Sequence, residues 1–177
     1  MGTLTKHSKV NLIIGVITKN EKLLQDATKH LRRKFGAIDY QSPIIDFNFT
    51  DYYEKEMGLN LKRCFFSFKK LIAPETLCDI KLYTNGLEKK FSRSKNKPSR
   101  TINLDPGYIT AAKLVLATTK DYAHRVYLAK GIFAEITMHF KNGGFQHFNW
   151  TYPDYRTQEY KDVFNRIRAL YLRKKHG

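Results

Sequence analysis

The sequence has 177 residues, 42% of them hydrophobic, and carries 32 Lys and Arg against 16 Asp and Glu, a formal net charge of +16. A chain of this length and apolar content can bury a core, which excludes a wholly disordered protein. No apolar run reaches the roughly 18 residues of a membrane span. The apolar stretch near the N-terminus lacks the small-residue cleavage site of a signal peptide, so we expect a strand there.

Two cysteines, Cys64 and Cys78, stand at a spacing that matches neither a CxxC motif nor a zinc pair. Isolated thiols are typical of a reducing compartment, so we expect a cytoplasmic protein with no membrane partner. We expect both thiols to be buried or half-buried. We predict one α+β domain over residues 1–177, with residues 1–9 flexible and residues 92–100 forming a basic loop.

The positive charge has two interpretations. Most clusters lie at the ends of predicted helices, where the helix dipole favours cations and a solvated surface is sufficient explanation. Alternatively, the clusters form an electrostatic footprint for a nucleic acid. The clusters lie at residues 32–34, 69–70, 89–90, 93–100 and 173–175.

The chain begins with a strand and a helix. Residues 10–18 are apolar on both faces, as in a central strand. Asn20 can cap a helix over residues 21–35, and Gly36 can end it. The helix carries an apolar stripe at helical spacing, consisting of Leu23, Leu24, Ala27, Leu31 and Phe35.

Two strands, a helix and a third strand follow. Residues 44–49 alternate between apolar and polar, and residues 63–68 are rich in aromatics, so both predict strands. Pro74 suits the first turn of a helix that extends to about residue 91. A short strand is predicted over residues 101–105. The resulting β-α-β-β-α-β order is compatible with a ferredoxin-like βαββαβ core.

The remaining sequence predicts more sheet and a last helix. A strand is predicted over residues 113–118, with a short helix as the alternative. Residues 124–128 and 132–140 predict a hairpin whose loop places Gly131 in the left-handed region. That register sets Arg125 opposite Glu135 and Tyr127 opposite Phe133. Thr157 can cap a C-terminal helix with a buried stripe of Tyr160, Val163, Phe164, Ile167 and Tyr171.

Polar clusters stand where the predicted strands stop. They are FTDYYEKEMG (49–58), NLDPGY (103–108), TTKDYAHR (118–125) and WTYPDY (150–155). Asp-Pro-Gly within the second cluster is typical of a turn, because proline fixes one dihedral and glycine supplies positive φ.

These four segments, with SFKKLI (67–72), IKLYTNGLEKKF (80–91), KLVLATTKD (113–121) and GIFAEIT (131–137), resemble an uncharacterised bacterial family known only as a domain of unknown function, number 4416. The resemblance covers about residues 10–168. It implies a small, single-domain cytoplasmic protein, and it implies no activity, cofactor or catalytic residue.

A candidate site follows from period-two alternation along the strands. Asn103 and Asp105 share one face, and Glu135, Thr137 and His139 share another. Together with Asp46 and Asn48, these polar faces form a cleft if the C-terminal region and the Tyr-rich loops roof them. The predicted catalytic residues are Asp105, Glu135 and His124. The predicted ligand-binding residues are Asp51, Tyr52, Tyr53, Lys81, Asn85, Asn103, Tyr108, Lys113, Lys120, Arg125, Tyr152, Asp154 and Tyr155.

The residue types leave the chemistry open. Asp51, Glu56, Asp105, Glu135 and His124 are oxygen and nitrogen donors suited to a divalent metal, although no HxxxH, HExxH or DxDxDG spacing supports one. The cations suit phosphates, and the tyrosines suit stacking on bases. The plain structural alternative is that Arg125 pairs with Glu135 and that His124 is a hydrogen-bonded, half-buried imidazole.

Three hypotheses remain open at this point. The first is binding of a phosphate-bearing ligand, a nucleotide or RNA, in the polar cleft. The second is a metal-dependent hydrolase or transferase acting on a nucleotide or nucleic acid. The third is a non-catalytic module for protein interaction. The sequence does not decide between an enzyme and a binding protein, nor does it set the oligomeric state.

Overall fold

The computed structural model describes residues 2–3, 7–50, 53–92 and 100–176. The strands are β1 (Asn11–Thr18), β2 (Ile38–Gln41), β3 (Ile45–Asp46), β4 (Lys62–Phe68), β5 (Asn103–Ile109), β6 (Lys113–Thr118), β7 (Arg125–Ala129), β8 (Ile132–Lys141) and β9 (Gly144–His147). The α-helices are α1 (Glu21–Phe35), α2 (Glu54–Met57), α3 (Leu77–Phe91) and α4 (Gln158–His176). Short 3₁₀ turns, Pro74–Thr76 and Asp154–Arg156, precede α3 and α4.

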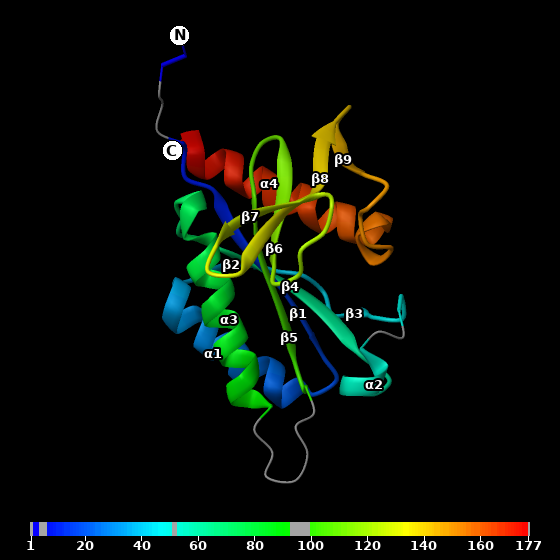
Figure 1. Cartoon of the computed structure of the whole chain (residues 1–177). Helices are drawn as coiled ribbons and strands as arrows, with labels where there is room; N and C mark the ends of the chain where they lie inside the picture. The colour runs from blue at the N-terminus through cyan, green and yellow to red at the C-terminus, as the bar shows by residue number, and fades with distance from the viewer. Residues whose placement is uncertain (1, 4–6, 51–52, 93–99, 177) are drawn as a thin grey trace.

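One open antiparallel sheet of nine strands organises the α+β fold (Figure 1). The strand order is β2-β4-β1-β5-β6-β8-β7, with β3 paired to β4 and β9 paired to β8. The sheet is therefore wider than the four strands of a βαββαβ sandwich, and its order as a whole does not show a ferredoxin-like topology. No helix within the described residues is long and apolar enough to cross a membrane.

Helices cover both faces of the sheet. α1 and α3 pack together on one face, where Leu12, Ala27 and Ile80 share a buried cluster. α4 covers the other face, where Ile13 and Phe164 share a second cluster. Figure 1 shows α1 and α3 side by side, with α4 crossing the sheet apart from them. Successive β1 residues enter different layers, which explains why the whole strand is buried and apolar.

The first and last helices confirm their predicted ends. The Asn20 side chain accepts a hydrogen bond from the Leu23 amide at 3.0 Å, and Gly36 ends α1 with a φ of 92°. At α4, the Thr157 hydroxyl accepts from the Tyr160 amide at 3.3 Å. The whole predicted stripe of α4 is buried. Local capping and helical spacing were therefore sufficient signals at both places.

The turn predicted at Asp-Pro-Gly is wrong, since β5 extends through it to Ile109. The reason is close packing of the neighbouring strand: a Cβ on Gly107 would lie 2.3 Å from the Val115 carbonyl oxygen. Pro106 precedes the first residue pair between β5 and β6, so it lies where that pairing ends and a missing N–H is tolerated.

Two further predictions change in detail. The strand predicted over residues 44–49 contracts to the two residues of β3, and β2, which was not predicted, pairs beside it with β4. The β7–β8 hairpin confirms the opposition of Arg125 to Glu135, while its loop contains only Lys130 and Gly131, at φ values of 54° and 75°. The loop predicted over residues 92–100 falls largely outside the described residues, as do residues 1 and 4–6 of the segment expected to be flexible.

Candidate functional site

A cavity of about 400 Å³ opens where β5 and β6 separate. The two strands pair only at Gly107, Tyr108 and Ile109, so the first half of β5 and the second half of β6 diverge. We call this space the β5–β6 cavity. Residues following β3 and preceding α4 complete its wall, which brings aromatic rings from distant parts of the sequence onto one space.

Arg63 is buried in the wall and holds two carboxylates. Its Nη1 donates to Asp105 Oδ2 at 2.9 Å, and its Nη2 donates to Asp154 Oδ2 at 3.1 Å. Three rings lie over the guanidinium carbon at 5.3–5.6 Å, those of Phe47, Phe65 and Tyr155. Arg63 is 2% exposed, so its pair with buried Asp154 is shielded from solvent, whereas Asp105 is half-buried.

The two carboxylates on Arg63 respond differently to the shared cation. Burial alone would raise the pKa of Asp105, but Arg63, Lys81 and Arg100 outweigh burial and lower it below its ordinary value. For Asp154, burial outweighs Arg63 and raises the pKa. The pair therefore combines a firmly anionic carboxylate with one that takes up a proton more readily.

A second chain of contacts continues from Asp105 toward α3. Asn103 Nδ2 donates to Asp105 Oδ2 at 2.6 Å, and Arg100 donates to Asn103 Oδ1. Arg100 also pairs with Glu88 at 3.1 Å, and Glu88 Oε1 accepts from the Leu104 amide at 2.6 Å. Burial raises the pKa of Glu88 despite the nearby Lys81 and Arg100. These contacts fix the unpaired edge of β5 to the helix.

Lys81 reaches the same cavity from α3. The residue is 6% exposed, and its ammonium donates to the Leu104 carbonyl oxygen at 3.0 Å. Of the carboxylates in the described residues, none lies within 4 Å of this ammonium. An ammonium has three hydrogen-bond donors. Among the described residues, no charged group accepts a hydrogen bond from this buried cation.

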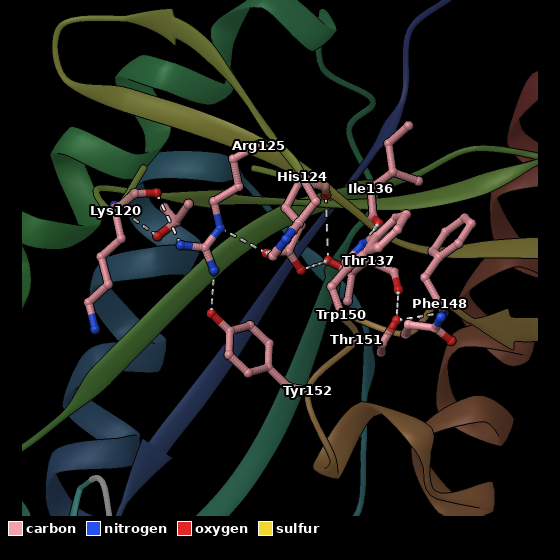
Figure 2. Close-up of polar contacts among 12 residues, drawn as sticks. Lys120, His124, Arg125, Ile136, Thr137, Phe148, Trp150, Thr151 and Tyr152 are labelled. Atoms are coloured by element: carbon pink, nitrogen blue, oxygen red, sulfur yellow. Dashed lines mark hydrogen bonds and ion pairs between the residues drawn. The ribbon is translucent and has the colours of Figure 1, made fainter. Parts of the chain in front are cut away.

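Glu135 forms the opposite wall of the cavity, and its charge is paired with residues that do not line the cavity. Its Oε2 accepts from Arg125 Nε at 2.9 Å and lies 3.1 Å from His124 Nε2. Arg125 Nη2 donates to the Tyr152 hydroxyl at 2.7 Å, as Figure 2 shows. These contacts agree with the structural alternative in which Arg125 pairs with Glu135 and His124 is a hydrogen-bonded imidazole. Neither Arg125 nor His124 lines the cavity.

The segment that roofs the cavity is tied to β8. The Thr151 hydroxyl donates to the Thr137 carbonyl oxygen and accepts from the Phe148 amide (Figure 2). Trp150 Nε1 donates to the Ile136 carbonyl oxygen at 3.0 Å. The Trp150 ring stacks between Phe148 and His124, with centroid distances of 4.6 and 5.4 Å. Tyr152 is thereby held at the rim.

The structure brings many of the predicted residues together around one space. Those that line the β5–β6 cavity are Tyr53, Lys81, Asn103, Asp105, Lys120, Glu135, Tyr152, Asp154 and Tyr155. They come from β5, β8, α3 and three connecting segments, and the cavity has the roof of C-terminal residues and tyrosines that the sequence predicts.

Other predicted residues lie elsewhere. Tyr108 packs against Cys78 and Val115 on the α3 side, and Asn85 and Lys113 do not line the cavity. His139 lies on the opposite face of β8 from Glu135, because a bulge around Thr137 interrupts the period of two. Asp46 pairs with Lys62, and Asn48 is exposed and does not line the cavity. The prediction for Asp51 and Tyr52 lies outside the described residues.

No group of three or more His, Cys, Asp or Glu in the described residues is placed to hold a metal. Asp105 and Glu135 each engage an arginine instead. Glu56 lies 3.9 Å from Arg100. The predicted donor set therefore does not converge in the part of the chain that the structure describes, and Asp51 lies outside it.

Arg63 is the central residue that sequence reasoning missed. In the sequence, a single cation at the start of an aromatic strand is also what a solvent-exposed strand end would show. The available signal was Gly15, a glycine in the middle of an otherwise apolar strand, which is typical of close approach by another group. Arg100 was assigned to the basic loop and also proves to line the cavity.

Comparisons with curated proteins and with solved structures found no match to this chain. The family comparison gave one. The model of the Domain of unknown function (DUF4416) matches residues 8–171, which include every described element of the cavity wall. The chain therefore belongs to the DUF4416 family.

Proposed function

We propose that the chain binds a small phosphate-bearing molecule of nucleotide size in the β5–β6 cavity. A volume of about 400 Å³ is in the usual range for small-molecule sites. The wall combines cations with the rings of Phe47, Tyr53 and Tyr152. Cations suit phosphate oxygens and rings suit a planar base, so the wall offers both halves of a nucleotide a partner.

The single observation that carries this proposal is Lys81. A buried ammonium is costly unless it is paired, yet this one has a neutral carbonyl as its hydrogen-bond partner. Asp105 and Glu88 interact with it electrostatically but beyond ion-pair distance. An anionic group of a ligand would supply the missing partner.

Two polar atoms in the same wall lack a hydrogen-bond partner. Arg63 Nε and the Tyr155 hydroxyl are buried without a hydrogen-bond partner in the part of the chain that the structure describes. Such groups are rare in folded proteins and call for an explanation. Solvent does not reach either atom, so they do not by themselves indicate a ligand, and Lys81 carries the proposal.

The test is ligand-induced thermal stabilisation, with a nucleoside, its monophosphate and triphosphate, and inorganic phosphate as the probes. We expect the melting temperature to rise with the concentration of the phosphorylated nucleoside. Lys81→Gln keeps a donor for Leu104 but removes the charge, so binding should weaken at least tenfold. Lys113→Gln, the same change outside the cavity, should bind as the wild type does. Absence of any shift, or equal affinity in both variants, would overturn the proposal.

A metal-dependent hydrolase or transferase acting on such a ligand is the second candidate. The observation in its favour is the opposite pKa shift of Asp105 and Asp154 on one arginine, which suits one group to act as base and the other as acid. Turnover of a bound nucleoside triphosphate that EDTA abolishes would support this function. Binding without turnover, with and without added Mg²⁺, would reject it.

We also propose a ferredoxin-like arrangement for the central strands and a cytoplasmic location. In favour of the first is the order β2-β4-β1-β5, with α1 and α3 as the connecting helices. In favour of the second are Cys64 and Cys78, both buried and free, which suit a reducing compartment.

A further inference from the structure

The basic clusters that are dispersed in the sequence meet at one end of the sheet. α1 ends in the exposed residues Arg32, Arg33 and Lys34. Directly beside this end, the Lys69 amide donates to the Ala37 carbonyl oxygen at 2.8 Å. Lys69 and Lys70 are exposed, so cations from two separate segments lie next to one another.

The two terminal segments add cations at the same end. The Tyr171 hydroxyl donates to the Lys9 carbonyl oxygen at 3.1 Å, which joins the end of α4 to the start of β1. Lys174 Nζ donates to the Phe68 carbonyl oxygen at 2.8 Å, one residue before Lys69. Figure 1 shows the two chain ends on the same side of the molecule. Lys9, Arg173 and Lys175 are exposed there.

We call these eight exposed cations the basic pole. It lies at the opposite end of the sheet from the β5–β6 cavity. β1 starts beside Phe68 and ends beside Arg63 and Asn103, so the two sites are separated by the length of that strand, roughly 20 Å at about 3.3 Å per residue. The pole is therefore a second site and not an extension of the cavity.

The charge of the pole is not balanced internally. Asp39 pairs with Lys174 at 2.5 Å, but none of the eight pole cations lies within 4 Å of a carboxylate in the described residues. Helix dipoles account for Arg32, Arg33, Lys34, Arg173 and Lys175. They do not account for Lys9, Lys69 and Lys70, which precede or follow strands. The gathering therefore exceeds what solvated helix ends explain.

The side chains around the pole also restrict the partner. The large exposed apolar and aromatic side chains of the described residues lie in other segments, such as those of Val126, Tyr127 and Trp150. Among the described residues the pole thus offers no large exposed side chain as an anchor for a bilayer, and the half-buried Tyr83 ring is already covered by Lys34 at 5.2 Å rather than open to an unpaired base. Lysines and arginines on a packed scaffold match the regularly spaced phosphates of a duplex.

We propose that the basic pole docks on the phosphate backbone of double-stranded nucleic acid, independently of base sequence. Such contacts release counterions, so affinity falls steeply with salt. With about six phosphate contacts, the association constant should drop about 1,000-fold between 50 and 200 mM salt. Two duplexes of unrelated sequence should bind equally.

Fluorescence anisotropy with labelled 20-base-pair DNA and RNA duplexes tests this proposal. The pole variant carries Arg32→Gln, Arg33→Gln, Lys69→Gln and Lys70→Gln. The matched control carries Lys22→Gln, Lys89→Gln, Lys90→Gln and Lys141→Gln, four exposed cations outside the pole with the same change in net charge. We expect the pole variant to bind at least 30-fold more weakly at low salt, with a smaller salt slope, and the control to bind within about threefold of the wild type.

Several outcomes overturn the proposal. They are equal loss in both variants, which would make net charge alone responsible, a flat dependence on salt, and binding to vesicles rich in phosphatidylserine but to neither duplex. The pole variant should keep the wild-type melting temperature and the wild-type response to nucleotides in the cavity. A failure of the duplex-binding proposal can therefore be distinguished from a failure of the nucleotide-binding proposal. Agreement between the DNA and RNA arms would assign recognition to the backbone, and a preference would identify the duplex.

Discussion

Gly15 and Arg63 share one space on neighbouring strands: a Cβ on Gly15 would lie 2.8 Å from Arg63 Nη1. Gly15 stands between Phe65 of β4 and Asp105 of β5 in the sheet. The ion pair between Arg63 and Asp105 therefore crosses β1 above a residue without a side chain. This is why one glycine interrupts an otherwise fully apolar central strand.

Gly15→Ala should destabilise the protein by about 1–3 kcal/mol, because the added methyl group displaces a buried guanidinium or the Phe65 ring. Urea denaturation monitored by circular dichroism measures the change. Gly86→Ala is the control, since a Cβ at that helical position meets nothing within 4 Å. The control should be neutral or stabilising by up to about 1 kcal/mol. Equal stability of Gly15→Ala and the wild type would show that Arg63 does not need this space.

Arg63→Met should cost about 3–5 kcal/mol of stability, because it leaves the buried Asp154 and the half-buried Asp105 without their cation. Lys29→Met removes a cation from an exposed pair with Asp26 and should change stability by no more than about 0.5 kcal/mol. If the two substitutions have similar effects on the urea midpoint, the buried network does not stabilise the fold.

Asp105→Asn and Asp154→Asn should alter the pH dependence of stability in opposite directions. The folded-state pKa of Asp105 is lowered, so the wild type holds stability from this group above its ordinary pKa of 3.8 and loses it as pH falls through the folded pKa. The folded-state pKa of Asp154 is raised, so that contribution is fully present below 3.8 and is lost as pH rises through the folded pKa.

Relative to the wild type, Asp105→Asn should therefore become less stable as pH rises across this range, and Asp154→Asn should become more stable. Melting temperatures of the three proteins from pH 2.5 to 7 measure both differences. Parallel curves for the two variants would contradict the assignment of opposite shifts to the carboxylates on Arg63.

Thr151→Val should cost about 1–3 kcal/mol, because it leaves the Phe148 amide and the Thr137 carbonyl without their partner. It should also weaken ligand binding in the cavity, since Tyr152 follows directly. Thr28→Val serves as the control, because that hydroxyl bonds only to the Leu24 carbonyl of its own helix. An unchanged urea midpoint for Thr151→Val would show that the roof does not depend on this contact.

Where structure is determined locally, the sequence was sufficient. The caps at Asn20 and Thr157 and the opposition of Arg125 to Glu135 depend on residues close in the chain, and each is confirmed. The turn at Asp-Pro-Gly failed because its outcome depends on Val115, which approaches from another strand. Local propensity and tertiary packing favour different conformations there, and packing prevails.

The candidate site shows the same limit. Period-two reasoning placed Asn103 and Asp105 on one face, and both line the cavity. It misplaced His139, because a bulge in β8 cannot be deduced from an alternating pattern. It also missed Arg63, whose role depends on Asp154, a residue far along the chain. Convergence of distant segments is a property of topology, which a single sequence expresses only weakly.

The narrow junction between β5 and β6 has a mechanical consequence. The sheet consists of two panels, one from β2 to β5 and one from β6 to β7, which pair at Gly107, Tyr108 and Ile109 and through a hydrogen bond from the Thr110 amide to the Lys113 carbonyl oxygen. A ligand that contacts Asp105 on one panel and Glu135 on the other would bridge the two panels. Occupancy then couples the opening of the two panels, and amide hydrogen exchange along β5 and β6 slows together.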